Sequence, residues 1–479
     1  MIKANPVRYS IWLTLFLTVC LLLAEHNVIW LHGVPDVDAK IAQLNGSLWR
    51  QFAYLAIGAV GLVGAYVTVL VQRVSLKWNR LVTTLLGLLL GWCVLSLLWA
   101  AAPTITAKRL LVLGLMFSGA LGLALSWTRI EILRFLALSS ALQVTVDFGA
   151  ELLSGIVPWG PDYKFSGMLG YNREAYVCIV LTFSALCLAR QGRSDRWFYS
   201  VLASCGFVFL LLTRSRGGQL AFFTALVLYL LVTLGVRQRV FAVFGIATLA
   251  LVLIMSGVAP TLLSVLDRGG EGSENFNGRG PLWEELMVYA RRRPLTGYGY
   301  ENFWTASMIS DVSGDQGWQM SDAHSGYLES LLQLGWPGAA LHALTLITCM
   351  GVGIRLFRRT GAYVYFLSAA LCLIYLVGGL LEGLMIIKAS EISFDFALLL
   401  CVTAVQPQYA AREDPASQRP VDAESFHGMR DRKGNGLPIN RQPHQAGTQR
   451  CEADRNQSPS SCKLMFPGKY PNRQQLHQR

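Results

Sequence analysis

The chain has 479 residues, of which 53% are hydrophobic and only 15% are charged, and its mean hydropathy is +0.42. A soluble domain carries about 25% charged residues, so this composition excludes an ordinary soluble enzyme or binding module. The net charge of +12 is partly carried by a polar C-terminal segment and does not indicate a nucleic-acid partner. Most of the 10 cysteines lie in apolar runs without a C-x-x-C pair, so neither a disulfide framework nor a zinc site is expected.

Apolar runs long enough to cross about 30 Å of hydrocarbon recur along the chain. They predict spans at residues 9–24, 51–71, 81–100, 110–127, 132–153, 175–189, 197–213, 217–236, 240–257, 326–350, 361–381 and 392–406. The first run follows the charged segment "MIKANPVR" and lacks a clear cleavage site, so we interpret it as an uncleaved span. The sequence therefore predicts an all-α polytopic membrane protein with about 12 transmembrane helices.

Lysine and arginine residues predict the orientation of these spans. With the N-terminus in the cytoplasm, the short inner loops contain dense basic runs such as "RQGRSDR" at 190–196 and "RLFRR" at 355–359. This distribution follows the positive-inside rule and also places the C-terminus in the cytoplasm. The junction "TRSRGG" at 213–218 is an exception, because its two arginines face outward.

The one long loop between predicted spans, residues 258–325, also lies on the outer side. Its segment "GPLWEELMVYARRRP" has the start and stop signals of a short helix. Pro281 stands in the first turn, acidic residues follow it, and basic residues fill the last turn before Pro294. We therefore expect a long extracytoplasmic loop that contains short helices.

We divide the chain into three parts. Residues 1–160 form N-terminal transmembrane helices, and residues 161–406 form a transmembrane core that includes the long loop. The apolar content falls sharply after Gln406, and the last segment is rich in Pro, Gln, Ser and Asn. Residues 407–479 are therefore expected to be a disordered cytoplasmic tail.

Arg214 and Arg216 are the first candidates for a binding site. The ordinary explanation is that they extend from helix ends towards the membrane interface. Their outward position against the charge rule favours a functional role, because ionisable residues at a membrane edge often mark substrate paths. Gly217 and Gly218 follow and leave the N–H groups of the next helix uncovered, which together with guanidinium groups makes an anion site.

Two further outer features have simpler alternatives. Arg279 stands between glycines just before the predicted loop helix, where it could be no more than a solvated loop arginine. Asn172 lies at the outer end of a predicted span in "SGMLGYNREAYV", where helix capping is the expected role.

His324, in "SDAHSGYLES", is the candidate for a general base. An isolated histidine is commonly structural, but its ordinary pKa near 6.5 suits the deprotonation of a hydroxyl group. Asp322 or Glu329 could orient the ring. The outer loops contain no D-x-D or H-E-x-x-H cluster, so we expect no metal.

Taken in order, these motifs resemble those of the O-antigen ligase and polymerase superfamily. The matching residues are Ser215-Arg216-Gly217, Gly278-Arg279, Trp283, Pro294, Gly297, Gly299, Phe303-Trp304, Ala323-His324 and Tyr327-Leu328-Glu329. The resemblance covers residues 160–400 and is strongest to the branch of exopolysaccharide polymerases, through "RRRPLTGYGYENFW". One departure is Ser325-Gly326, since the family usually has Asn after the histidine.

The resemblance implies a metal-independent, inverting glycosyltransferase in the bacterial cytoplasmic (inner) membrane that uses no cofactor. Such an enzyme moves a glycan from undecaprenyl pyrophosphate to an acceptor hydroxyl on the periplasmic side. Its expected partners are the undecaprenyl-pyrophosphate-linked oligosaccharide and membrane lipids, with a flippase and a chain-length regulator acting beside it.

The resemblance also implies roles for the candidate residues. Arg216 and Arg279 would bind the pyrophosphate with assistance from Arg214, and His324 would remove the proton of the acceptor hydroxyl. The supporting residues would be Asp322, Tyr327, Glu329 and Asn172.

Three alternatives stay open at this stage. The glycan could be polymerised as an exopolysaccharide repeat unit, which we favour, or ligated to lipid A core. A transporter or flippase for lipid-linked glycans would instead predict charged residues at mid-span, whereas the span interiors here are nearly uncharged. A structural or regulatory membrane protein would leave the ordered series of motifs without a role.

Overall fold

The computed structural model describes residues 10–25, 48–158, 160, 163–191, 195–235, 237–238, 279–316, 320 and 322–408. All of them belong to one compact unit, Met1–Val421. The predicted span at 240–257 and all but the first two residues of the predicted tail, 407–479, lie outside the described residues.

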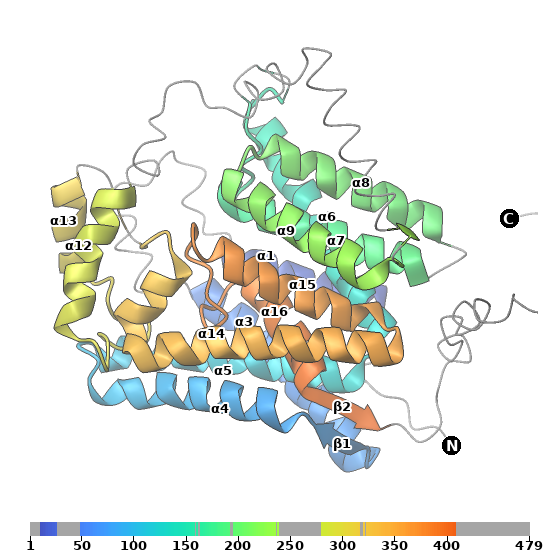
Figure 1. The fold of residues 1–479 in the computed structure, drawn as a ribbon, viewed down its shortest axis with the longest axis horizontal. Coiled ribbons are helices and arrows are strands. Elements are labelled where there is room, and N and C mark those ends of the chain that lie inside the picture. Colours follow the sequence, from blue (N-terminus) through green and yellow to red (C-terminus); the bar gives the residue numbers. More distant parts are fainter. Residues whose placement is uncertain are drawn as a thin grey trace, which may run out of the picture. The chain divides into compact units, whose positions relative to one another are not determined.

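The described part of the chain is built almost entirely of helices (Figure 1). They are α1 (Ile11–Glu25), α3 (Leu48–Tyr66), α4 (Arg80–Leu95), α5 (Pro103–Ser126), α6 (Arg129–Leu153), α7 (Tyr171–Gln191), α8 (Arg196–Leu212), α9 (Arg216–Thr233), α12 (Arg279–Arg292), α13 (Ala306–Gln316), α14 (Gly326–Thr360), α15 (Tyr363–Gly378) and α16 (Glu391–Ala404). A π-helical turn (Val67–Val71) extends α3, and a 3₁₀ turn (Ser96–Leu98) follows α4. Two short strands, β1 (Ser75–Trp78) and β2 (Val405–Gln408), pair antiparallel.

Among the described residues, 7 helical segments are long and apolar enough to cross a membrane, and α1, α8 and α15 are shorter apolar helices. Each predicted span within the described residues coincides with an observed helix. The prediction of an all-α polytopic membrane protein is therefore confirmed. The short helix predicted in the long loop is also observed, as α12.

The predicted span at 132–153, which three charged residues interrupt, forms one continuous helix, α6. A capping box starts it, in which the Thr128 side chain accepts from the Glu131 N–H and the Glu131 carboxylate accepts from the Thr128 N–H. Asp147 and Glu151 near its other end are buried, at 0% and 1% exposure. These charges do not end the helix because they face the protein interior instead of lipid.

Contacts between loops agree with the predicted alternation of helix ends. At the ends predicted to lie outside, the Glu391 N–H donates to Glu25 at 3.0 Å and Arg50 donates to the carbonyl of Ala389. At the ends predicted to lie inside, β1 pairs with β2, far apart in sequence. The structure therefore brings together helix ends that the sequence assigned to the same side of the membrane.

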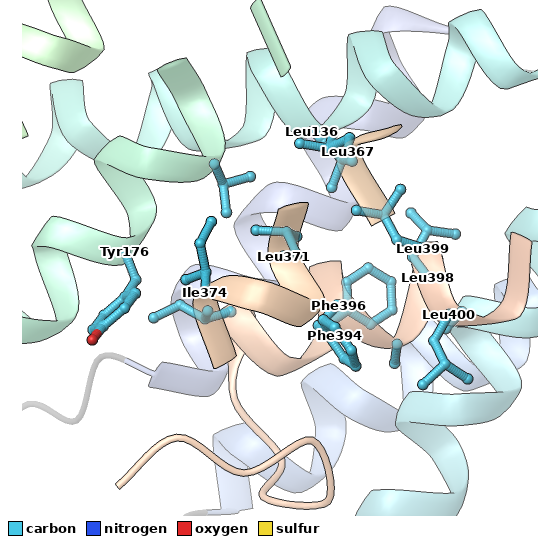
Figure 2. Close-up of a cluster of buried hydrophobic side chains, with 14 of the residues drawn as sticks. Leu136, Tyr176, Leu367, Leu371, Ile374, Phe394, Phe396, Leu398, Leu399 and Leu400 are labelled. Atoms are coloured by element: carbon cyan, nitrogen blue, oxygen red, sulfur yellow. The ribbon is translucent and has the colours of Figure 1, made fainter. Parts of the chain in front are cut away.

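Helix α16 lies at the centre of the hydrophobic core, and all of its residues are buried. Figure 2 shows its side chains Phe394, Phe396 and Leu398 in one cluster with side chains from α6 and α15. A helix enclosed on every face cannot shift without disturbing its neighbours. It therefore fixes the position of residues 379–390, the loop that leads into it from α15.

Helix α14 is broken at Gly335, where φ is 67° and ψ is −173°, and Pro337 follows. A Cβ atom at Gly335 would lie 2.5 Å from the backbone carbonyl of Leu295, so only glycine fits this close approach. The next residue, Trp336, donates its N–H to the carbonyl of Pro294 at 2.8 Å. The long helix is thus two helical segments joined at a fixed bend.

The break frees backbone carbonyls in an apolar environment, where each needs a donor. The Tyr298 N–H, the Gly299 N–H and the Trp92 indole N–H donate to the carbonyls of Leu332, Gln333 and Leu334 at 2.8, 2.9 and 2.9 Å. The motif "PLTGYGY" at 294–300 therefore attaches the long loop to the bend of α14. Figure 1 shows α12 and α13 close to that end of α14.

This attachment predicts the effect of a Gly335→Ala substitution. Alanine at a positive φ costs about 1–2 kcal/mol in backbone strain alone, and the clash with Leu295 adds to it. We expect a clearly lower midpoint of thermal unfolding for the purified protein. The control is Gly351→Ala on the same helix, where an added Cβ meets nothing within 4 Å and helix propensity improves by about 1 kcal/mol. Equal midpoints for the two variants would contradict the fixed bend.

Candidate functional site

His324 and Asp322 form a pair in the segment before α14. Oδ1 of Asp322 lies 3.1 Å from Nδ1 of His324 and accepts the His324 backbone N–H at 2.9 Å. A carboxylate can only accept, so the ring proton is on Nδ1 and the lone pair is on Nε2, the form needed to take a proton from a substrate. Both side chains reach solvent, at 26% and 31% exposure.

Asp322 is held as an anion. Burial raises the pKa of this carboxyl, but the charges of His324 and Lys388 and the N–H of His324 outweigh it and lower the pKa to about 2. An ionised Asp322 orients the imidazole and stabilises its protonated form. Of the two acids predicted to orient His324, Asp322 is the one in contact with it.

Glu329 contacts the backbone beside His324 instead. It is 2% exposed, and its carboxylate accepts the Ala323 N–H at 2.6 Å and the Trp304 indole N–H at 2.8 Å. The Trp283 indole donates to the carbonyl of Ala323 at 2.9 Å. Both backbone polar groups of Ala323 are therefore fixed, and these bonds account for the acid and the tryptophans in the sequence pattern. His324 itself has a φ of 47°, a rare conformation that such clamping sustains.

Ser325-Gly326 makes a close contact with the loop at 379–390. This is the position at which the sequence departs from the superfamily pattern. A Cβ at Gly326 would overlap the carbonyl oxygen of Leu384. Its N–H donates to the carbonyls of Gly379 and Glu382 at 2.8 and 2.9 Å. The glycine thus joins the histidine segment to this loop.

The remaining supporting residues hold helices together. The Tyr327 hydroxyl donates to the carbonyl of Leu376 at 2.8 Å, which joins α14 to α15. Oδ1 of Asn172 accepts the Ser215 hydroxyl at 2.9 Å, and Ser215 in turn caps α9 by accepting the Gly218 N–H. Asn172 therefore supports the start of α9 beside the two predicted arginines.

Arg279, the first residue of α12, binds a carboxylate that the sequence analysis did not single out. Its Nη2 lies 3.1 Å from Oε1 of Glu382, and its Nη1 donates to the carbonyl of Leu381. Burial raises the pKa of Glu382 and the charge of Arg279 only partly offsets this, so the pKa is about 7. The group changes protonation near neutral pH while it holds Arg279.

The start of α9 lies against the same two residues. A Cβ at Gly217 would be 3.7 Å from Cβ of Leu381 and 3.9 Å from Oε1 of Glu382. Arg216 precedes it and is exposed, whereas Arg214 is partly buried with a φ of 50°. The arginine junction and Arg279, distant in sequence, therefore meet at Glu382.

Residues 379–390 connect the two halves of the site. Glu382 contacts Arg279, and a Cβ at the next residue, Gly383, would lie 3.8 Å from Oδ1 of Asp322. The His324–Asp322 pair, which can accept a proton, and the guanidinium of Arg279, which can bind an anion, thus lie next to one short loop. Sequence reasoning missed this loop; its only signal is the isolated acid in the apolar run "GGLLEGLMII".

Within the described residues, no group of three or more His, Cys, Asp and Glu side chains could hold a metal ion.

Comparison with curated proteins found no match. A protein-family model described as O-antigen ligase matches residues 198–343. This range runs from α8 into α14 and includes Arg216, Arg279 and His324, while the loop at 379–390 lies beyond it. The match confirms the resemblance at the level of the superfamily but not the exopolysaccharide branch. Residues 198–343 of this multi-pass membrane protein are thus similar to the O-antigen ligase family.

Proposed function

We propose that the protein is a glycosyltransferase that moves a glycan from undecaprenyl pyrophosphate to an acceptor hydroxyl at the periplasmic face of the bacterial inner membrane. The family match supports a membrane role in ligating or polymerising glycans. The observation that carries the finer proposal is that the His324–Asp322 and Arg279–Glu382 pairs meet at consecutive residues of one loop.

His324 acts as the general base in this reaction. Nε2 removes the proton of the acceptor hydroxyl as its oxygen attacks the anomeric carbon. The new C–O bond forms on the face opposite the pyrophosphate, the bond from the anomeric carbon to the pyrophosphate oxygen breaks, and the configuration inverts. Asp322 stabilises the imidazolium until the proton passes to water.

The arginines stabilise the leaving group. Its negative charge grows in the transition state, and fixed guanidinium groups oriented towards it lower the barrier most. Arg279 and Arg216 bind the pyrophosphate, with Arg214 assisting. A guanidinium can bind two phosphate oxygens at once, so the reaction in this form requires neither a metal ion nor a cofactor.

We favour polymerisation of an exopolysaccharide repeat unit over ligation to lipid A core. A flippase would deliver the lipid-linked units, and a chain-length regulator would limit the product. A deletion strain separates the two possibilities: loss of a polymerase leaves single lipid-linked repeat units, whereas loss of a ligase leaves long lipid-linked chains. Long chains in that strain would reject polymerisation.

The positions of the buried acids favour the glycosyltransferase over the transporter alternative. Asp147, Glu174 and Asp395 lie within two turns of the helix ends predicted to face outward, not at mid-span. A transporter would carry ionisable groups near the bilayer centre along the path of its substrate.

His324→Ala is expected to reduce polymer formation by about 10²–10⁴-fold, the usual contribution of a general base. The measurement is the amount and chain length of extracellular polymer in a deletion strain that expresses the variant at the wild-type level. Ser310→Ala, on an exposed position of α13, is the control and should make normal polymer. Normal chain lengths from His324→Ala would rule out the base role.

Arg279→Lys and Arg216→Lys keep the charge but lose the two-pronged donor geometry. We expect each to lower the rate with lipid-linked donor by roughly 10–100-fold. Arg291→Lys, at an exposed position of α12, serves as the control and should be unaffected. If Arg279→Lys were as active as this control in a reconstituted assay, pyrophosphate binding by Arg279 would be wrong.

Donor affinity is expected to depend on pH through Glu382, whose pKa is about 7. Below pH 7 the carboxyl is neutral and leaves Arg279 to the pyrophosphate; above it the carboxylate competes for the guanidinium. The KM for donor should therefore rise with pH through 7, by at most about 10-fold per pH unit. The donor is a pyrophosphate diester that does not titrate in this range. Glu382→Gln should give a flat profile, and a slope unchanged in that variant would exclude Glu382 as the cause.

A further inference from the structure

His342 is a buried histidine that the proposed reaction does not use. It lies in α14 about two turns beyond the break at Gly335 and is 2% exposed. Its Nδ1 lies 2.9 Å from the hydroxyl oxygen of Ser330, which belongs to the segment before the break. Its Nε2 accepts the backbone N–H of Ile386 at 3.4 Å. One imidazole therefore contacts both segments of α14 and the loop at 379–390.

The surrounding bonds determine which ring nitrogen carries the proton. The Ser330 hydroxyl donates its only proton to the carbonyl of Gly326 at 2.7 Å, so its oxygen accepts from Nδ1 of His342. Nε2 accepts the Ile386 N–H and therefore carries the lone pair. The ring is thus neutral, with its proton on Nδ1, and both of its nitrogens are bound within the protein.

A serine and a histidine at hydrogen-bonding distance can form a nucleophilic pair, but Ser330 and His342 do not. They are buried, at 0% and 2% exposure, where no glycan reaches them. The serine proton is also directed to the Gly326 carbonyl and not to the ring, whereas a general base would have to accept it. The imidazole therefore acts through the groups that it holds.

One of these groups is the loop that contains Glu382. Ile386 belongs to the same loop and is fully buried, at 0% exposure. Within the described residues, its N–H has no acceptor other than His342. A buried N–H without an acceptor is costly, so the imidazole determines where this part of the loop lies.

The other group is the start of α14. Ser330 binds the carbonyl of Gly326, and the N–H of Gly326 donates to the carbonyl of Glu382 at 2.9 Å. The hydrogen bonds that leave His342 through Ser330 and Gly326 thus return to it through the loop. This closed set of bonds joins the loop to the segment that contains His324.

We propose that His342 is a positioning residue, whose imidazole holds the loop at 379–390 in a fixed place relative to the segment that contains His324. The proposal rests on the proposed function, because it assigns to this imidazole the alignment of the base with Arg279, which the loop binds through Glu382. Reacting groups must be held close to their productive geometry, and a misplacement of about 1 Å can lower a rate by about 10²-fold.

Two substitutions separate the two bonds of the ring. In His342→Gln the side-chain oxygen can take the place of Nε2 and accept the Ile386 N–H. In His342→Asn the amide nitrogen can take the place of Nδ1 and donate to Ser330. His342→Phe removes both bonds while it fills the space. Thr345→Val is the matched control, because Thr345 is also buried in α14 but its hydroxyl binds the carbonyl of Leu341 in the same helix.

The first measurement is amide hydrogen exchange at Ile386, by mass spectrometry with residue-level fragmentation, on the full chain in lipid nanodiscs. We expect exchange to be roughly 10-fold faster in His342→Asn and His342→Phe, the effect of one lost hydrogen bond. Exchange in His342→Gln and in Thr345→Val should match the wild type. Equal exchange in His342→Asn and His342→Gln overturns the proposal, and this comparison still decides if His342→Phe does not fold.

The second measurement is the amount of extracellular polymer that each variant makes in the deletion strain at the wild-type expression level. His342→Asn and His342→Phe should lower it by about 10–100-fold, whereas His342→Gln should keep most of it. This rescue by one of two similar amides separates positioning from a general loss of packing. Polymer from His342→Asn equal to that from Thr345→Val would overturn the positioning role. No polymer from the wild type would reject the proposed function, while the exchange comparison still decides whether His342 holds the loop.

Discussion

The bend of α14 is the constraint on which the rest of the site depends. A helix in an apolar environment cannot leave carbonyl groups unpaired, so a break is tolerated only where other donors replace the missing bonds. Here those donors are the backbone of Tyr298 and Gly299 and the indole of Trp92. The carbonyl groups at the bend therefore bind the loop motif at 294–300. This attachment holds α12, with Arg279 at its start, beside the other helices.

A second constraint is the buried helix α16. Because all of its residues are buried, the loop that precedes it has little freedom. The His324 segment is attached to that loop by the backbone hydrogen bonds of Gly326, and Arg279 is attached to it by its ion pair with Glu382. Parts of the candidate site that are more than 100 residues apart in sequence are thus held at one loop, as the proposed electrostatic stabilisation of a leaving group requires.

The sequence predicted the helices well, because long apolar runs in a membrane protein leave few alternatives. It also singled out His324, Asp322 and the arginines as candidates, since each is an ionisable residue in an unusual place. It could not predict Glu382, which stands just beyond the end of an apparently ordinary span, because its partner Arg279 comes from a distant loop. The sequence left open whether Asp322 or Glu329 orients His324, because the contacts of Glu329 with Ala323 and Trp304 depend on a backbone conformation that no spacing rule predicts.

In the proposed reaction, the contact between Arg279 and Glu382 creates a conflict between holding Arg279 in place and releasing it to the pyrophosphate. A carboxylate at 3.1 Å satisfies a guanidinium that is mostly buried, and without it the charge would lack a partner until substrate arrives. The same carboxylate opposes an incoming pyrophosphate. Protonation resolves this conflict at low cost, because burial already holds the pKa of Glu382 at about 7. The acid can therefore keep Arg279 in place while the site is empty and become neutral when the pyrophosphate takes over the guanidinium, so that like charges never meet.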